Sequence, residues 1–118
     1  MNSNKGTGNR GENMAADHLL TLHYSIIERN WRFKHWEVDI IACKGKKLHF
    51  VEVKTRTNEY FGKPEQSIGR AKMDCLKNAA EEYMYKYPMW KYLQFDVIAI
   101  TLDREEVKEI FMIEDVYF

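Results

Sequence analysis

Two acidic residues and a lysine lie inside two neighbouring hydrophobic segments of the sequence. The stretch 38–56, VDIIACKGKKLHFVEVKTR, places Asp39 in the first segment and both Glu52 and Lys54 in the second. Both segments are typical of β-strands, and the polar KGKK between them predicts a tight hairpin turn. An unpaired charge inside a sheet costs free energy. These three residues therefore need a structural or a chemical explanation.

The hairpin register predicts which charged side chains meet. With Gly45 and Lys46 as the two loop residues, Asp39 faces Glu52 and Glu37 faces Lys54. Side chains alternate along a strand, so all four charged side chains are expected on one face. A shift of the register by one residue would put the apolar residues of the two strands on opposite faces, which disfavours that alternative.

Two directly opposed acids have Cβ atoms about 5 Å apart, where like charges destabilise the sheet. Such a pair either shares a proton or binds a cation. Carboxylate oxygens suit Mg²⁺ or Mn²⁺, and a nearby lysine can neutralise a phosphate or orient water. The alternative is a plain Glu37–Lys54 ion pair, with Asp39 and Glu52 on a solvated face. The residue pattern alone leaves both interpretations open.

The elements that would position these residues can be read from periodicity and turn signals. The expected helices span residues 10–22, with Asn9 as the N-cap, and residues 65–87, ended by Pro88. The expected strands span residues 24–33, 37–43, 48–56, 93–102 and 107–113. This order predicts an α/β sandwich around a mixed sheet.

Length and composition favour one globular domain over residues 1–118, with residues 1–8 flexible and residues 114–118 as a tail. No apolar run approaches the roughly 20 residues that span a bilayer, and the polar N-terminus lacks a signal peptide, so we expect a cytoplasmic protein. Cys43 and Cys75 lack metal-ligand spacing and are expected to be reduced. The net charge is zero, but residues 1–56 carry +4 and residues 57–118 carry −4, which permits a nucleic-acid partner.

Asp39 followed by Glu52-Val53-Lys54 resembles the PD-(D/E)xK nuclease motif. The segments RGENMAADHL, RNWRF, WEVDIIA, FVEVKTR, FGKPEQSI and FDVIAI extend the resemblance over residues 8–101. Their order and spacing resemble the YraN-type family, uncharacterised protein family 0102, which is similar to archaeal Holliday junction resolvases. The resemblance implies a restriction-endonuclease-like three-layer sandwich, with a central mixed sheet of about five strands flanked by helices.

The same resemblance implies roles for individual residues. Asp39 and Glu52 would hold a Mg²⁺ or Mn²⁺ ion, Lys54 would be the catalytic lysine, and Glu12 would add an acid from the first helix. Glu37 or Glu12 would hold a second cation or a metal-bound water. The alternative role for Glu12 is to interact favourably with the helix dipole in the first turn. The expected DNA contacts are Arg32, Lys34, Arg56, Gln66 and Lys72, and Trp31, Trp36 and Tyr60 are candidate stacking residues. The alternative for the three aromatic residues is packing in the core or at its edge. Lys72 lies near the apolar stripe of its helix, so its charged end must reach solvent or meet a partner.

These features predict a divalent-metal-dependent endonuclease that acts on double-stranded or branched DNA such as Holliday junctions. An alternative is a catalytically inactive nucleic-acid-binding or adaptor protein that retains the nuclease fold. Trp36 and Gln94 favour that alternative, because the family usually has glycine and arginine at these positions. A third hypothesis is a protein-interaction module, and a homodimer fits the resolvase resemblance.

Overall fold

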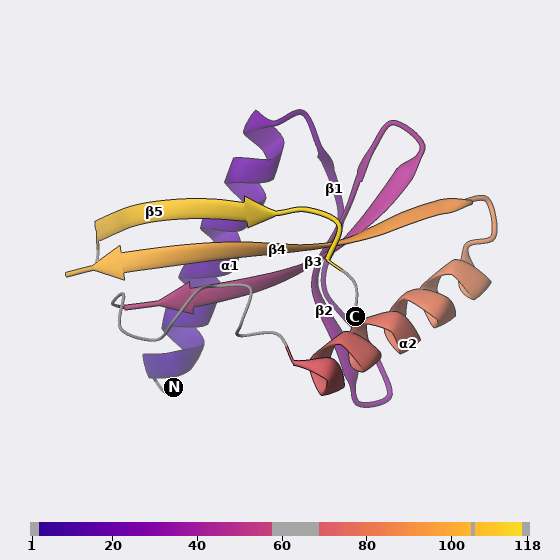
Figure 1. Ribbon diagram of the computed structural model, residues 1–118, viewed down its shortest axis with the longest axis horizontal. Helices are drawn as coiled ribbons and strands as arrows, with labels where there is room; N and C mark the ends of the chain where they lie inside the picture. Colours follow the sequence, from indigo (N-terminus) through magenta and orange to yellow (C-terminus); the bar gives the residue numbers. More distant parts are fainter. Residues whose placement is uncertain (1–2, 58–68, 105, 117–118) are drawn as a thin grey trace.

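A computed structural model describes residues 3–57, 69–104 and 106–116, with side chains from residue 10 onward. The described chain forms two helices and five strands in the order helix, three strands, helix, two strands (Figure 1). The elements are α1 Ser3–Thr21, β1 Ser25–Phe33, β2 Trp36–Lys44, β3 Lys47–Arg56, α2 Arg70–Lys86, β4 Tyr92–Asp103 and β5 Glu106–Ile113. The element order predicted from the sequence is confirmed.

The five strands form one mixed sheet in the order β1-β2-β3-β4-β5. Neighbouring strands are antiparallel except β3 and β4, which run parallel. A parallel pair needs a crossover connection, and α2 belongs to the segment that connects β3 to β4. The described chain is thus an α/β protein with a five-stranded mixed sheet, as the sequence predicts.

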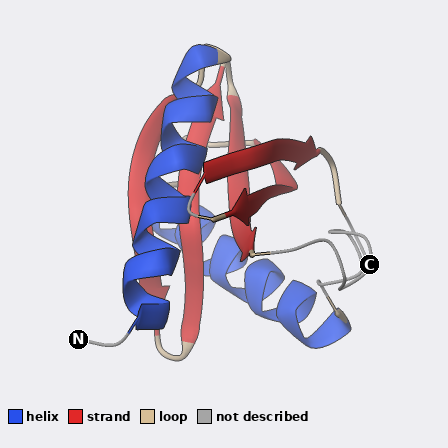
Figure 2. Cartoon of the chain, turned by 90° about the vertical axis from the view of Figure 1, so that its left-hand side faces the viewer, coloured by secondary structure: helices blue, strands red, loops and turns tan. Residues whose placement is uncertain are grey.

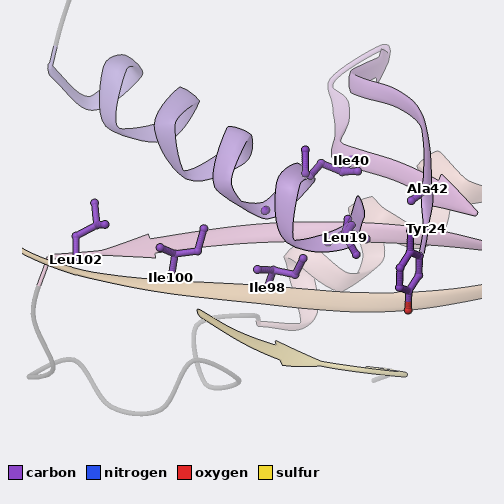
Figure 3. Close-up of a cluster of buried hydrophobic side chains, with 10 residues drawn as sticks. Leu19, Tyr24, Ile40, Ala42, Ile98, Ile100 and Leu102 are labelled. Atoms are coloured by element: carbon purple, nitrogen blue, oxygen red, sulfur yellow. The ribbon is translucent and has the colours of Figure 1, made fainter. Parts of the chain in front are cut away.

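Each helix covers one face of this sheet (Figure 2). α1 contributes Leu19 to a buried cluster with residues of β2, β3 and β4, among them Ile40, Ile98 and Ile100 (Figure 3). α2 contributes Leu76 and other apolar residues to a second cluster on the opposite face. Because side chains alternate along a strand, β2 and β3 are apolar on both faces wherever both helices cover them. A charged residue in these strands is therefore conspicuous.

The β2–β3 hairpin has the register that the sequence predicts. Lys44 pairs with Lys47 around a two-residue turn, and Ile40 pairs with Val51. Gly45 in the turn has φ +64°, a left-handed conformation that glycine adopts without steric cost.

Two helix boundaries differ from the prediction. α1 begins at Ser3, so residues 3–9 lie inside the helix and Asn9 cannot be its N-cap. The described part of α2 begins at Arg70 with Gly69, in an extended conformation, as its N-cap. The predicted start at Glu65 lies outside the described residues. None of the helices in the described part of the chain is long and apolar enough to cross a bilayer.

Candidate active site

Asp39 lies where β2 and β3 stop pairing as a regular ladder. The paired register runs from the turn as far as Ile40 and Val51, and Asp39 is the next residue of β2. Its Oδ2 accepts a hydrogen bond of 2.9 Å from the backbone N–H of Val53. The Asp39 side chain, rather than a backbone carbonyl of β2, thus accepts the hydrogen bond from this backbone N–H of β3. This arrangement holds the Asp39 side chain against β3 at the end of the ladder.

Glu52 is one residue from this contact and is almost completely buried, with 5% of its surface exposed. Val51 and Val53 face the α1 side, so alternation points Glu52 to the α2 side. Its Oε1 lies 3.9 Å from Lys54 Nζ, and its Oε2 lies 3.2 Å from Lys72 Nζ. The Oε2 atom is buried and has no partner with hydrogen-bond geometry. One lysine therefore comes from the same strand and the other from the first turn of α2.

The environment of Glu52 favours its protonated form. Burial raises the pKa of this carboxyl to about 7, and the negative charge of Asp39 contributes to the same shift. The ammonium groups of Lys72 and Lys54 oppose the shift but do not cancel it. The effect of Asp39 on this pKa indicates that the two acids lie near each other, although the regular β2–β3 register ends one residue before they would pair. A carboxyl with a pKa near neutrality in a cluster of charges is typical of functional sites.

The same cluster of charges favours the charged form of Lys72. Burial on its own would lower the pKa of its ammonium group, but the charge of Glu52, a hydrogen bond to it and the charge of Asp39 act in the other direction, and the net effect raises the pKa. Lys72 therefore stays charged, and its side chain is one third exposed. The sequence indicated that this lysine, close to the apolar stripe of its helix, needs a partner for its charge. That partner is Glu52.

Glu12 brings a third acid toward the cluster from α1. Burial raises the pKa of its carboxyl, a hydrogen bond to Asn30 lowers it, and the charge of Asp39 raises it again. Its Oε2 lies 3.7 Å from Arg29 Nη2 and is buried without a hydrogen bond. The charge of Asp39 thus raises the pKa of both Glu12 and Glu52.

Gly11 lets α1 approach β3 closely enough to place Glu12 there. A Cβ atom at position 11 would lie 2.0 Å from Oγ1 and 3.3 Å from Cβ of Thr55. Any side chain would therefore push the helix away from the strand. Gly11 and Glu12 thus combine a close helix–strand contact with an acid whose pKa responds to the charge of Asp39.

Glu37 does not make the contact that extension of the register predicts. Its Oε2 lies 3.2 Å from Arg32 Nη2 on β1, whereas Lys54 contacts Glu52. The prediction of a Glu37–Lys54 pair is wrong, because the regular β2–β3 ladder ends before Glu37 and leaves it paired with β1. Arg32 keeps 71% of its side chain exposed.

Lys34 and Arg56 are the remaining predicted DNA contacts that the structure describes. Lys34 is exposed at the β1–β2 turn, with Nζ 5.5 Å from the ring centre of Phe33 and 5.8 Å from that of Trp36. Arg56 is half-buried at the end of β3. Gln66 and Tyr60 lie outside the described residues. Trp31 and Trp36 pack partly against the α2-side core cluster, so they are only partly available for stacking.

The donor set suits one kind of metal ion better than another. Among the residues that the structure describes, no three His, Cys, Asp or Glu side chains come close enough to hold a metal ion by themselves. A zinc cage of three or four protein ligands is therefore not formed by these residues. Mg²⁺ is commonly bound through one or two carboxylates, with water and phosphate oxygens as its other ligands. Asp39 and Glu52, with its buried Oε2 lacking a hydrogen bond, fit that pattern.

A second buried polar cluster was missed in the sequence. His49 Nδ1 lies 2.7 Å from Asp96 Oδ2, and both side chains are buried. Asp96 Oδ1 accepts hydrogen bonds from Gln94 Nε2 and from the backbone N–H of Asp115. The signal was an aspartate within the otherwise apolar run FDVIAI. This cluster joins β3, β4 and the segment after β5, and its bonds indicate a structural role.

Fold and site thus define an α/β protein with a carboxylate–lysine cluster at the end of a strand ladder. The sequence model described as uncharacterised protein family UPF0102 matches residues 11–100. A UPF0102 protein of Geotalea daltonii is 43% identical over 117 residues, or 98% of this chain and 92% of the relative. Those of Dictyoglomus thermophilum (42% identical, 86% and 87% of the two chains) and Clostridium perfringens (36%, 97% and 95%) are similar over most of their length. The chain therefore belongs to the UPF0102 family.

Proposed function

We propose that this protein is a divalent-metal-dependent endonuclease acting on DNA, with Asp39, Glu52 and Lys54 at its centre. The observation that carries the proposal is the buried Glu52 carboxyl beside Asp39, where the β2–β3 ladder ends. Its buried Oε2 atom lies 3.2 Å from Lys72 Nζ but has no partner with hydrogen-bond geometry, so it can accept a further ligand. The resemblance to the PD-(D/E)xK motif, and through it to a restriction-endonuclease-like fold, supports the same assignment.

Asp39 and Glu52 would hold the ion. When bound, a Mg²⁺ ion would polarise a scissile phosphate and lower the pKa of a water molecule. The hydrogen bond from the Val53 N–H fixes the orientation of the Asp39 carboxylate before the ion arrives. Glu52 must lose its proton to bind, and the two lysine ammonium groups beside it favour that loss. Catalysis should therefore weaken below about pH 7, where Glu52 holds its proton.

Lys54 and Lys72 would act on the DNA rather than on the ion. Lys54 Nζ is 3.9 Å from Glu52 Oε1, and its side chain is one third exposed. It can donate to an attacking water or to the developing charge on the phosphate. Lys72, equally exposed, can contact a neighbouring phosphate while it remains paired with Glu52. Arg32 and Lys34, at the exposed β1–β2 end, are suited to backbone phosphates.

The assay is cleavage of labelled branched and linear duplex DNA with Mg²⁺, with Mn²⁺ or with a chelator. Asp39→Asn and Lys54→Ala should each lower the cleavage rate by at least about 100-fold. The matched controls Asp17→Asn and Lys108→Ala change exposed residues on α1 and β5 and should retain wild-type activity. Residual cleavage of equal rate in all four variants would refute the assignment.

One observation favours a second function, nucleic-acid binding without cleavage. When Glu52 is ionised, two acids and two lysines give the Asp39–Glu52 cluster no net charge, so it can remain stable without a cation. Such an adaptor would bind DNA with an affinity that falls steeply with salt and would release no cleaved product. Metal-independent binding together with absent cleavage in the assay above would favour this function.

A further inference from the structure

A groove lies at the other end of β3, between the β2–β3 turn and the segment that leads from α2 to β4. It has a volume of about 290 Å³ and is lined by Gly45, Lys46, Met89, Trp90, Lys91 and Tyr92. In Figure 1 these are the magenta turn after β2 and the orange loop before β4. We call this surface, together with the lysines beside it, the lysine–aromatic groove.

The two segments that form the groove carry only positive charge. Residues 43–51 and 83–95 together contain five lysines and no aspartate or glutamate, although the whole chain has zero net charge. Lys46 and Lys91, which line the groove, are exposed. Charge of one sign concentrated on a neutral protein indicates a partner of the opposite sign.

A like-charge pair strengthens this indication. Lys44 and Lys47 are directly opposed across the hairpin, an arrangement that destabilises a sheet. Lys44 Nζ lies 5.0 Å from the ring centre of Tyr24, and Lys47 Nζ donates a 3.3 Å hydrogen bond to Gln94. Neither contacting group is itself negatively charged, although Glu114 acts on Tyr24 and Asp96 accepts a hydrogen bond from Gln94. A polyanion bound at the hairpin would remove the repulsion.

The groove also exposes apolar and aromatic surface. Tyr92 is 61% exposed and Met89 is 68% exposed, while Trp90 is half-buried between the groove and the α2-side core cluster. Exposed aromatic rings beside lysines are the usual elements of single-stranded nucleic-acid sites, where bases stack on rings and phosphates meet cations. Base faces inside a duplex are already stacked and cannot reach these rings.

We propose that the lysine–aromatic groove binds a single-stranded nucleic-acid segment, with a base stacked on Tyr92 and phosphates at Lys46 and Lys91. The lysines of the groove favour a polyanion, and the exposed ring of Tyr92 favours a nucleic acid whose bases are unstacked. Lys47, the β3 neighbour of Tyr92, is five residues from Glu52, which corresponds to about 17 Å along a strand. The groove is therefore a separate surface, and its binding does not depend on the proposed cleavage.

The test measures fluorescence anisotropy of a labelled oligothymidylate of about 10 nucleotides, with the full chain and a chelator present. Tyr92→Ala should weaken binding by about 5- to 100-fold. Lys46→Ala/Lys91→Ala should lower the slope of log K against log salt by about 1.4. The matched controls are Tyr85→Ala, an exposed tyrosine outside the groove lining, and Arg104→Ala/Lys108→Ala, which removes the same charge elsewhere.

Controls that keep wild-type affinity while both groove variants lose it would support the proposal. No binding by the wild type, or equal losses in groove and control variants, would overturn it. Full displacement of the oligonucleotide by polyglutamate at equal charge concentration would also overturn it, because only non-specific charge attraction would then remain. Asp39→Asn should bind the oligonucleotide with wild-type affinity. Loss of cleavage and loss of binding at the groove can therefore be told apart.

Discussion

Replacement of Glu52 by glutamine should change how the stability of the protein depends on pH. Burial and the charge of Asp39 raise the pKa of Glu52 from 4.5 to about 7 in the folded state. The folded protein therefore binds this proton more tightly than the unfolded chain does. That contribution to stability is complete below pH 4.5 and is lost as the pH rises through 7. Glutamine resembles the protonated carboxyl and has no such dependence.

The magnitude follows from the shift. A change of 2.5 pKa units at 1.36 kcal/mol for each unit corresponds to about 3 kcal/mol. Relative to the wild type, Glu52→Gln should therefore gain about 3 kcal/mol of unfolding free energy between pH 4 and pH 8 when a chelator is present.

Urea unfolding at a series of pH values measures this difference directly. Glu109→Gln, an exposed acid on β5, is the matched control and should follow the wild type. Parallel curves for the wild type and Glu52→Gln would refute the reasoning, because they would show that Glu52 titrates alike in the folded and unfolded chains. Excess Mg²⁺ should stabilise the wild type at pH 8 and leave Glu52→Gln unchanged.

Three further predictions concern the surroundings of the site. Gly11→Ala should destabilise the protein by about 1–3 kcal/mol in thermal unfolding through its clash with Thr55, Thr55→Ala should partly restore it, and Asn13→Ala on the exposed side of α1 should have little effect. Asp96→Ala should cost about 2–4 kcal/mol, because it leaves His49 buried without its partner; a loss below 1 kcal/mol would contradict the structural role of that cluster. Binding of Mg²⁺ at pH 7 should release about half a proton from the buried glutamate, measured by calorimetry in buffers of different ionisation enthalpy; zero release would contradict the raised pKa.

The hairpin was predictable because its information is local. Alternating apolar residues on both sides of KGKK leave one register that buries them, and the pairing of Ile40 with Val51 follows from it. The same rule failed at Glu37, because the regular ladder ends before it. Where two strands stop pairing depends on side-chain contacts such as that between Asp39 and Val53 N–H, and periodicity carries no information about these.

Contacts between distant elements were only partly predictable. The helical pattern indicated that Lys72 needs a partner, but only the packing of α2 on the sheet identifies Glu52 as that partner. Asp96 interrupts an apolar run and was a visible signal for a buried polar contact. Its bond to His49 requires that β3 and β4 be neighbours, and a crossover connection does not encode that in local sequence.

A titration of the protein with Mg²⁺, followed by backbone and carboxyl chemical shifts, tests the central claim most directly. A metal site at Asp39 and Glu52 predicts saturable shifts confined to the region around Asp39, Val53 and Glu52, larger above pH 7 than below it and absent in Asp39→Asn. Weak shifts spread over all exposed acids, or identical titrations of the wild type and Asp39→Asn, would contradict a metal site between β2 and β3.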